Sequence, residues 1–156
     1  MLESLAVIFS LIYVILAARE NIWCWLAAAI SVCLYIYICY QAKLYAETAL
    51  QIFYLTMAVL GYLSWKKLNV KEIKKKESSI RELNIRQHIA IIFTGLIISF
   101  FLGFILTTYT DAKIPLLDAY TTVFSVIATL MVIKKILENW LYFIAIDIAS
   151  IYLYYS

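Results

Sequence analysis

The sequence predicts an all-α polytopic membrane helical bundle, and composition is the first reason. Of the 156 residues, 65% are apolar and only 15% are charged, whereas a soluble domain has about 45–50% apolar and about 25% charged residues. Lipid can accept this excess of apolar surface, provided that backbone polar groups are satisfied within helices or a closed barrel. Three glycines and one proline argue against a loop-rich chain. Period-2 alternation, the signature of a barrel, is absent.

Six stretches have the apolar length, about 20 residues, that a transmembrane helix needs. They are residues 2–18, 22–40, 44–65, 89–108, 115–133 and 139–155. The first stretch lacks a basic start and runs directly into Arg19 and Glu20. We therefore expect it to be a retained span rather than a cleaved signal peptide. The connections between the stretches are short, except the one between the third and the fourth.

The long connection, residues 66–87, sets the predicted orientation. Its eight basic residues are Lys66, Lys67, Lys71, Lys74, Lys75, Lys76, Arg81 and Arg86. Because Lys and Arg accumulate in short cytoplasmic loops, we place this loop inside the cell and the N-terminus outside. Arg19, Lys134 and Lys135 then also lie inside, and two basic residues are left outside. We expect the loop to contact anionic membrane lipid rather than nucleic acid.

Two parts of the chain resemble each other. Residues 8–12 (IFSLI) correspond to residues 123–127 (VFSVI), and Trp23 corresponds to Trp140, with tyrosines 12 and 14 residues downstream in both copies. Such self-similarity is typical of repeats, although apolar helices also look alike by chance. A triplet followed by one linker span restores the orientation, which predicts parallel repeats. We divide the chain into a first three-helix repeat (1–65), a basic cytoplasmic loop (66–87), a linker transmembrane helix (88–110) and an incomplete second repeat of two helices (111–156).

A carboxylate in the sixth span indicates function, because a charge in lipid is costly and seldom idle. Asp147 lies near the middle of this span, and Trp140, Phe143 and Asp147 follow each other at i, i+3 and i+7 on one helix face. Stacked rings beside an anionic group suit a flat cation. The alternative is a protonated Asp147 that forms a hydrogen bond between helices.

Polar residues also follow one face of the third and the fifth spans. Gln51 and Tyr54 share a face of the third span, and Gln51 needs a partner at its depth in the membrane. In the fifth span, Thr122 belongs to a polar stripe that includes Ser125, whose hydroxyls can also bond to their own backbone. Together these faces predict a water-accessible path between the third, fifth and sixth spans.

Three stretches of the sequence resemble the nicotinamide riboside transporters of the PnuC type. They are residues 44–54 (LYAETALQIFY) with 61–65 (GYLSW), residues 115–118 with the polar stripe that follows, and residues 138–143 (ENWLYF). The resemblance extends over nearly the whole chain. It implies a bacterial inner-membrane facilitator with a 3+1+3 helix plan, similar to the sugar-transporting SWEET proteins, that assembles as a homotrimer.

The resemblance also assigns residues to a substrate site. The family's Trp-x-x-Trp motif maps onto Trp140 and Phe143, its following polar position onto Asp147, and its third-span glutamine onto Gln51. The predicted substrate-binding residues are Trp140, Phe143, Asp147, Gln51, Asn139, Thr122 and Tyr54. Two features depart from the family pattern. Phe143 replaces the second Trp of the motif, and the sequence looks truncated before the expected seventh helix.

The function predicted from these observations is facilitated diffusion of a cationic aromatic vitamin precursor. Nicotinamide riboside is the first expectation for the substrate. Thiamine, also a flat cation, is the alternative, and an inactive truncated or structural membrane subunit is a further one. We expect no enzyme activity, because no catalytic motif or convincing acid–base pair is present. We also expect no cofactor, no metal and no nucleic acid.

Overall fold

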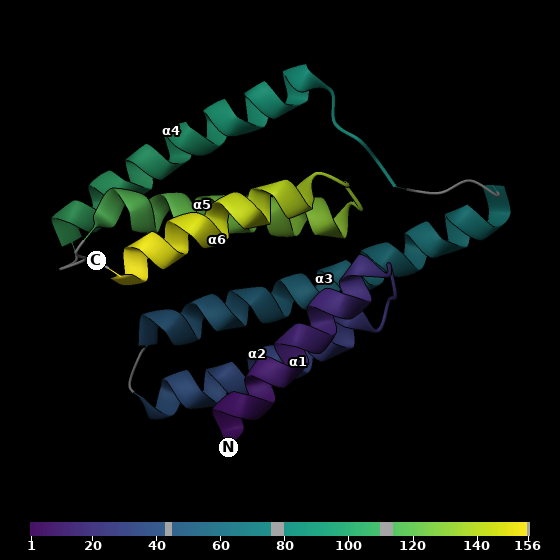
Figure 1. Ribbon diagram of the computed structural model, residues 1–156, viewed down its shortest axis with the longest axis horizontal. Helices are drawn as coiled ribbons and strands as arrows, with labels where there is room; N and C mark the ends of the chain where they lie inside the picture. Colours follow the sequence, from purple (N-terminus) through teal and green to yellow (C-terminus); the bar gives the residue numbers. More distant parts are fainter. Residues whose placement is uncertain (43–44, 76–79, 110–113, 156) are drawn as a thin grey trace. The chain divides into compact units, whose positions relative to one another are not determined.

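The computed structural model describes residues 1–42, 45–75, 80–109 and 114–155. Six α-helices account for almost all of these residues (Figure 1). They are α1 (Leu2–Ala18), α2 (Cys24–Gln41), α3 (Tyr45–Lys75), α4 (Ile85–Tyr109), α5 (Pro115–Ile133) and α6 (Asn139–Tyr155). Within the described ranges, the β-structure is limited to one isolated bridge between Arg81 and Ile136. The prediction of an all-α chain is confirmed.

The helices coincide with the predicted spans at most ends, but α3 and α4 extend beyond them. α3 continues ten residues past the expected end and reaches Lys75. Its 31 residues correspond to about 46 Å at the usual helical rise, which exceeds the about 30 Å of a bilayer core. α4 begins at Ile85, where the backbone N–H of Asn84 donates to Gln87 Oε1 at 3.0 Å. This contact caps the start of the helix without any need for apolar side chains.

The chain forms two compact units, residues 1–79 and 80–156. In the first unit, α2 packs against both α1 and α3. Hydroxyls join α1 to α2, since Ser31 Oγ donates to Ala6 O at 2.9 Å and lies 2.7 Å from Ser10 Oγ. Trp25 on α2 is almost fully buried and meets the edge of Trp65 on α3 at 5.5 Å between ring centroids. Small side chains and one large ring therefore hold this unit together.

In the second unit, α5 packs against both α4 and α6. Its core is made of Phe124 and Ala128 from α5 and Ile146 from α6. On α4, the buried positions are small residues spaced four apart, at Gly95, Ser99 and Gly103. Small residues at such spacing let helices approach closely in membranes. α5 is accordingly the most enclosed helix of this unit.

Half of the six described helices have the length and the apolar composition that crossing a membrane requires. Three of them are long and apolar enough to cross it, namely Cys24–Gln41, Ile85–Tyr109 and Pro115–Ile133. Leu2–Ala18 and Asn139–Tyr152 are shorter apolar helices. The outer face of α4 exposes about two thirds of each of Phe93, Phe100, Phe101 and Phe104. Lipid tolerates this apolar surface, whereas water would not.

The turns α1–α2 and α5–α6 have the same backbone geometry. Glu20 and Lys135 are the residues with positive φ, at 54° and 53°, among the described non-glycine positions. In both turns, the residue that follows donates to a carbonyl five positions back, Asn21 to Leu16 and Ile136 to Met131. Each helix thus ends in a Schellman motif. The parallel repeat stays a prediction, and the shared turn is consistent with it.

Candidate functional site

The three residues predicted on one face of α6 have different environments. Asp147 is exposed, and Trp140 exposes 36% of its surface. Phe143 is half-buried and packs against the core of the second unit. The residues of an i, i+3, i+7 series lie within about 60° of one another around a helix, and Phe143 is the one of the three that packs against the core of Phe124 and Ala128. Trp140 and Asp147 are thus accessible in the second unit, whereas Phe143 mainly supports the core.

Asn139 and Thr122 also belong to the second unit. Asn139 is buried at the start of α6, and its amide nitrogen donates to Ile136 O in the preceding turn. Its Oδ1 has no hydrogen-bond partner within the described part of the chain. Thr122 lies half-buried on α5. Asn139 therefore shapes the α5–α6 turn, in addition to any contact with a substrate.

Gln51 and Tyr54 belong to the first unit, on α3. Both are half-buried, and the ring of Tyr54 meets that of Phe53 edge-on at 6.0 Å. The seven predicted residues are thus divided between the units, two in the first and five in the second. Their assembly into one site stays a prediction.

The second unit has a groove of about 330 Å³ on its surface. Residues of α4, α5 and α6 line it, namely His88, Ile92, Leu96, Tyr120, Phe124, Leu141, Tyr142 and Ala145. The aromatic side chains form a series, with His88 stacked on Tyr142 at 5.9 Å, Tyr142 near Phe124 at 6.5 Å, and Phe124 against Tyr120 at 4.5 Å. The seven predicted residues do not line this groove.

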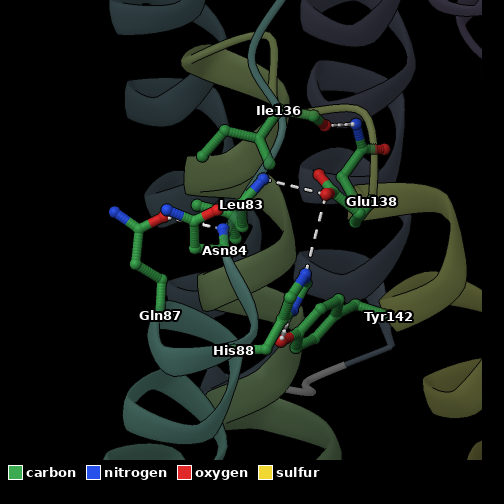
Figure 2. Close-up of polar contacts among 8 residues, drawn as sticks. Leu83, Asn84, Gln87, His88, Ile136, Glu138 and Tyr142 are labelled. Carbon is green, nitrogen blue, oxygen red and sulfur yellow. Dashed lines mark hydrogen bonds and ion pairs between the residues drawn. The ribbon is translucent and has the colours of Figure 1, made fainter.

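A polar junction adjoins His88, and Figure 2 shows it in detail. Glu138 Oε1 accepts a hydrogen bond from the backbone N–H of Leu83 at 2.8 Å and lies 3.6 Å from His88 Nε2. The other ring nitrogen of His88, Nδ1, lies 2.9 Å from the hydroxyl of Tyr142. The junction therefore connects the segment before α4, α4 itself and the start of α6.

Glu138 is negatively charged in this junction. Burial raises the pKa of its carboxyl, but hydrogen bonds from the N–H groups of Leu83 and of Glu138 itself, together with His88, outweigh burial and lower the pKa below its ordinary value. The carboxylate also lies at the N-terminal end of α6, where the helix dipole favours a negative charge. The second carboxylate oxygen, Oε2, is buried and has no hydrogen-bond partner in the described residues.

The first unit has its own apolar groove, of about 290 Å³. Its lining comes from α2 and α3 and from the turn before α2, with Trp23, Trp25, Leu26, Ala29, Ala58, Val59, Tyr62 and Leu63. Trp23 is 61% exposed and is the residue that corresponds to Trp140 in the predicted repeat. Both tryptophans of this pair are therefore accessible in their own units.

Sequence reasoning missed the junction of His88, Glu138 and Tyr142. Glu138 and Tyr142 are four residues apart around the start of α6, a spacing that brings side chains together on a helix. His88, by contrast, is 54 residues away from Tyr142 in the sequence, so no local spacing could predict the contact. In the sequence, His88 is only the first residue of the predicted linker helix (88–110).

The helical fold and the exposed apolar faces define this chain as a polytopic membrane protein. Comparison with known families gives the finer assignment, since residues 1–156 match the family described as nicotinamide mononucleotide transporter. The chain belongs to this family, and the predicted family relationship is confirmed.

Individual relatives agree with this assignment. The nicotinamide riboside transporter PnuC of Neisseria mucosa is 26% identical over 98% of this chain and 59% of its own length. The PnuC of Escherichia coli K12 is 22% identical over 98% of this chain and 73% of its own length. A crystal structure of the vitamin B3 transporter PnuC matches with a TM-score of 0.76 and 26% identity, over 97% of this chain and 66% of that one. The chain thus spans about 59% of the Neisseria relative.

Proposed function

We propose that this chain takes part in facilitated diffusion of nicotinamide riboside across the bacterial inner membrane. The observation that carries the proposal is the structural likeness to a solved vitamin B3 transporter, which extends over 97% of the chain. The names of the relatives from Neisseria mucosa and Escherichia coli support the same substrate. The structure adds accessible aromatic and acidic groups on α6 in a setting of apolar helices.

The residues proposed to bind the substrate are Trp140 and Asp147 on α6 in the second unit, and Gln51 and Tyr54 on α3 in the first unit. A pyridinium ring is flat and positively charged, so it stacks on an indole and is attracted by a carboxylate. Amide and phenol groups can bind the ribose hydroxyls, since they donate and accept hydrogen bonds. Phe143 contributes to the site indirectly, through the core that positions α6. Asn139 and Thr122 are the remaining proposed substrate-binding residues.

Uptake measurements test this function directly. Cells that lack their own nicotinamide riboside carrier would express the wild-type chain, Trp140→Ala or Asp147→Asn, each at matched membrane levels. We expect the wild type to take up labelled nicotinamide riboside. In both variants the uptake rate should fall at least about tenfold, which corresponds to about 1.4 kcal/mol. Ile148→Ala is the matched control, because Ile148 is 64% exposed beside Asp147 but is apolar.

Each outcome bears on a distinct part of the proposal. Wild-type uptake with undiminished transport in both α6 variants would remove the site assignment but keep the function. Uptake of labelled thiamine in preference to nicotinamide riboside would reassign the substrate. No uptake of either compound by a membrane-inserted wild type would favour a structural subunit over a carrier.

Assembly and orientation belong to the same proposal. We propose a homotrimer in which the loop 66–87 faces the cytoplasm and the N-terminus lies outside. The distribution of basic residues supports the orientation, because Lys and Arg favour the inner face. The mass of the detergent-solubilised particle, corrected for bound detergent, tests the trimer. A monomeric mass at all protein concentrations would exclude it.

A further inference from the structure

Glu138 makes contacts at the starts of two helices, with its backbone at α6 and with its side chain at α4. It directly precedes Asn139, the first residue of α6, and its carbonyl accepts from the N–H of Leu141 at 3.1 Å. Its carboxylate reaches in the other direction, to the N–H of Leu83 at 2.8 Å and toward His88 on α4 (Figure 2). The side-chain exposure of Glu138 is only 19%. Water therefore competes weakly for these contacts.

The backbone around Glu138 strengthens the connection. The N–H of Arg81 donates to Lys135 O at 2.9 Å, and the N–H of Leu137 donates to Arg81 O at 2.9 Å. These two bonds make a short parallel bridge between the segment before α4 and the α5–α6 turn. The bond from Leu83 to Glu138 is the next step in the same direction. The Glu138 carboxylate thus accepts the hydrogen bond that follows the two backbone bonds of the bridge.

We propose that Glu138 is a positioning residue, a clamp that ties the segment 81–83 and His88 to the start of α6 and so holds Trp140 in place. This role rests on the proposed function, because it matters for transport only if Trp140 contacts the substrate. Trp140 lies two residues after Glu138 and within the first turn of α6. A shift of this turn would move the indole directly, whereas residues deeper in α6 are held by the core around Ile146.

The strength of the contacts that Glu138 makes depends on its negative charge and on the groups around its carboxylate. The titratable group that acts on its carboxyl is His88 from α4, and His88 in turn contacts the hydroxyl of Tyr142 on α6. The backbone of Arg81 and Lys135 forms the neighbouring bridge. Loss of the negative charge of Glu138 would weaken both its hydrogen bond from the N–H of Leu83 and its contact with His88.

Hydrogen exchange at the Leu83 amide tests the clamp without any transport assay. In the full chain in lipid nanodiscs, we expect Glu138→Ala to accelerate exchange of this amide by roughly tenfold or more, since a charge-assisted hydrogen bond is lost. Glu138→Gln keeps an oxygen acceptor but loses the charge, so its exchange rate at neutral pH should lie between those of the wild type and Glu138→Ala. Glu82→Gln is the matched control, because Glu82 is exposed in the same segment and should change nothing.

Uptake kinetics then test the positioning role. We expect Glu138→Ala to raise the KM for nicotinamide riboside by about threefold or more, with the maximal rate per inserted protein changed much less, which a merely unstable variant would not do. Unchanged exchange at Leu83 in Glu138→Ala would overturn the clamp. Faster exchange with an unchanged KM would overturn its link to the site. A wild type that exchanges as described but transports nothing would instead refute the proposed function and leave the clamp standing.

Discussion

The indole ring of Trp25 lies directly against the backbone of Gly61. A Cβ atom at position 61 would come within 2.5–2.6 Å of three atoms of that ring, closer than side-chain carbons approach in real structures. On its other side, Trp25 meets Tyr13 of α1 at 6.1 Å between ring centroids. The missing side chain of Gly61 is therefore what lets α3 pack on α2 around a large buried ring.

Gly61→Ala should destabilise the first unit. The added methyl group forces the Trp25 ring to move within a packed core, and overpacking of this kind costs about 1–3 kcal/mol, which outweighs the better helix propensity of alanine. Thermal unfolding in detergent, followed by circular dichroism, would measure the loss. Val59→Ala is the control, because Val59 is 54% exposed on α3 and should change little.

A double-mutant cycle separates this clash from other causes. In the background Trp25→Leu, where a smaller side chain leaves room, Gly61→Ala should cost clearly less than it does in the wild type. Equal costs in both backgrounds would show that the ring is not what opposes a side chain at position 61.

Ser31→Ala should weaken the packing of α1 on α2. The hydroxyl of Ser31 is buried and donates to Ala6 O, and it also contacts Ser10. Hydrogen bonds between membrane helices contribute about 0.6 kcal/mol on average and up to about 1.7 kcal/mol, so we expect a loss within that range. Unfolding titrations in mixed micelles would measure it. Ser10→Ala alone should cost less, because the bond of Ser10 to Ala6 O lies within α1 whereas the bond of Ser31 to Ala6 O joins the two helices and remains in that variant.

Composition and hydropathy were sufficient to predict the helices of this chain. The apolar runs between polar connections predicted all six helices, because lipid demands length and apolarity of each span. The extension of α3 to Lys75 was not predicted by hydropathy, since half of residues 66–75 are lysines. These residues include good helix formers such as Lys and Leu, and propensity rather than burial explains why the helix continues.

The candidate site was less predictable than the fold. A spacing of i, i+3 and i+7 identified one side of α6, but it could not show that Phe143 faces the core while Trp140 and Asp147 are accessible. Which residue of one helix face becomes buried depends on the neighbouring helix, here on Phe124 and Ala128 of α5. The contact between His88 and Glu138 was likewise not predictable from spacing in the sequence. It arises because the folded chain brings the start of α4 next to the start of α6.

Acidification should remove the contribution of Glu138 to stability. Its pKa is lower in the folded chain than the ordinary value of 4.5, so its stabilising contribution is complete above about 4.5 and is lost as the pH falls through the lowered value. The difference in melting temperature between wild type and Glu138→Gln should therefore be full at neutral pH and shrink below about pH 4. A difference that stays constant down to pH 3 would contradict the role of the charge.

The orientation predicted from basic residues can be tested on a cysteine-free variant of the chain. A cysteine introduced by Glu82→Cys lies in the segment before α4, and one introduced by Glu3→Cys lies near the N-terminus; both positions are exposed. If the loop 66–87 is cytoplasmic, a membrane-impermeant maleimide added to intact cells should label position 3 and spare position 82 until the cells are opened. Eight basic residues in that loop strongly favour this result, because each one opposes translocation. Labelling of position 82 in intact cells would invert the topology and would place the Glu138 junction at the outer face.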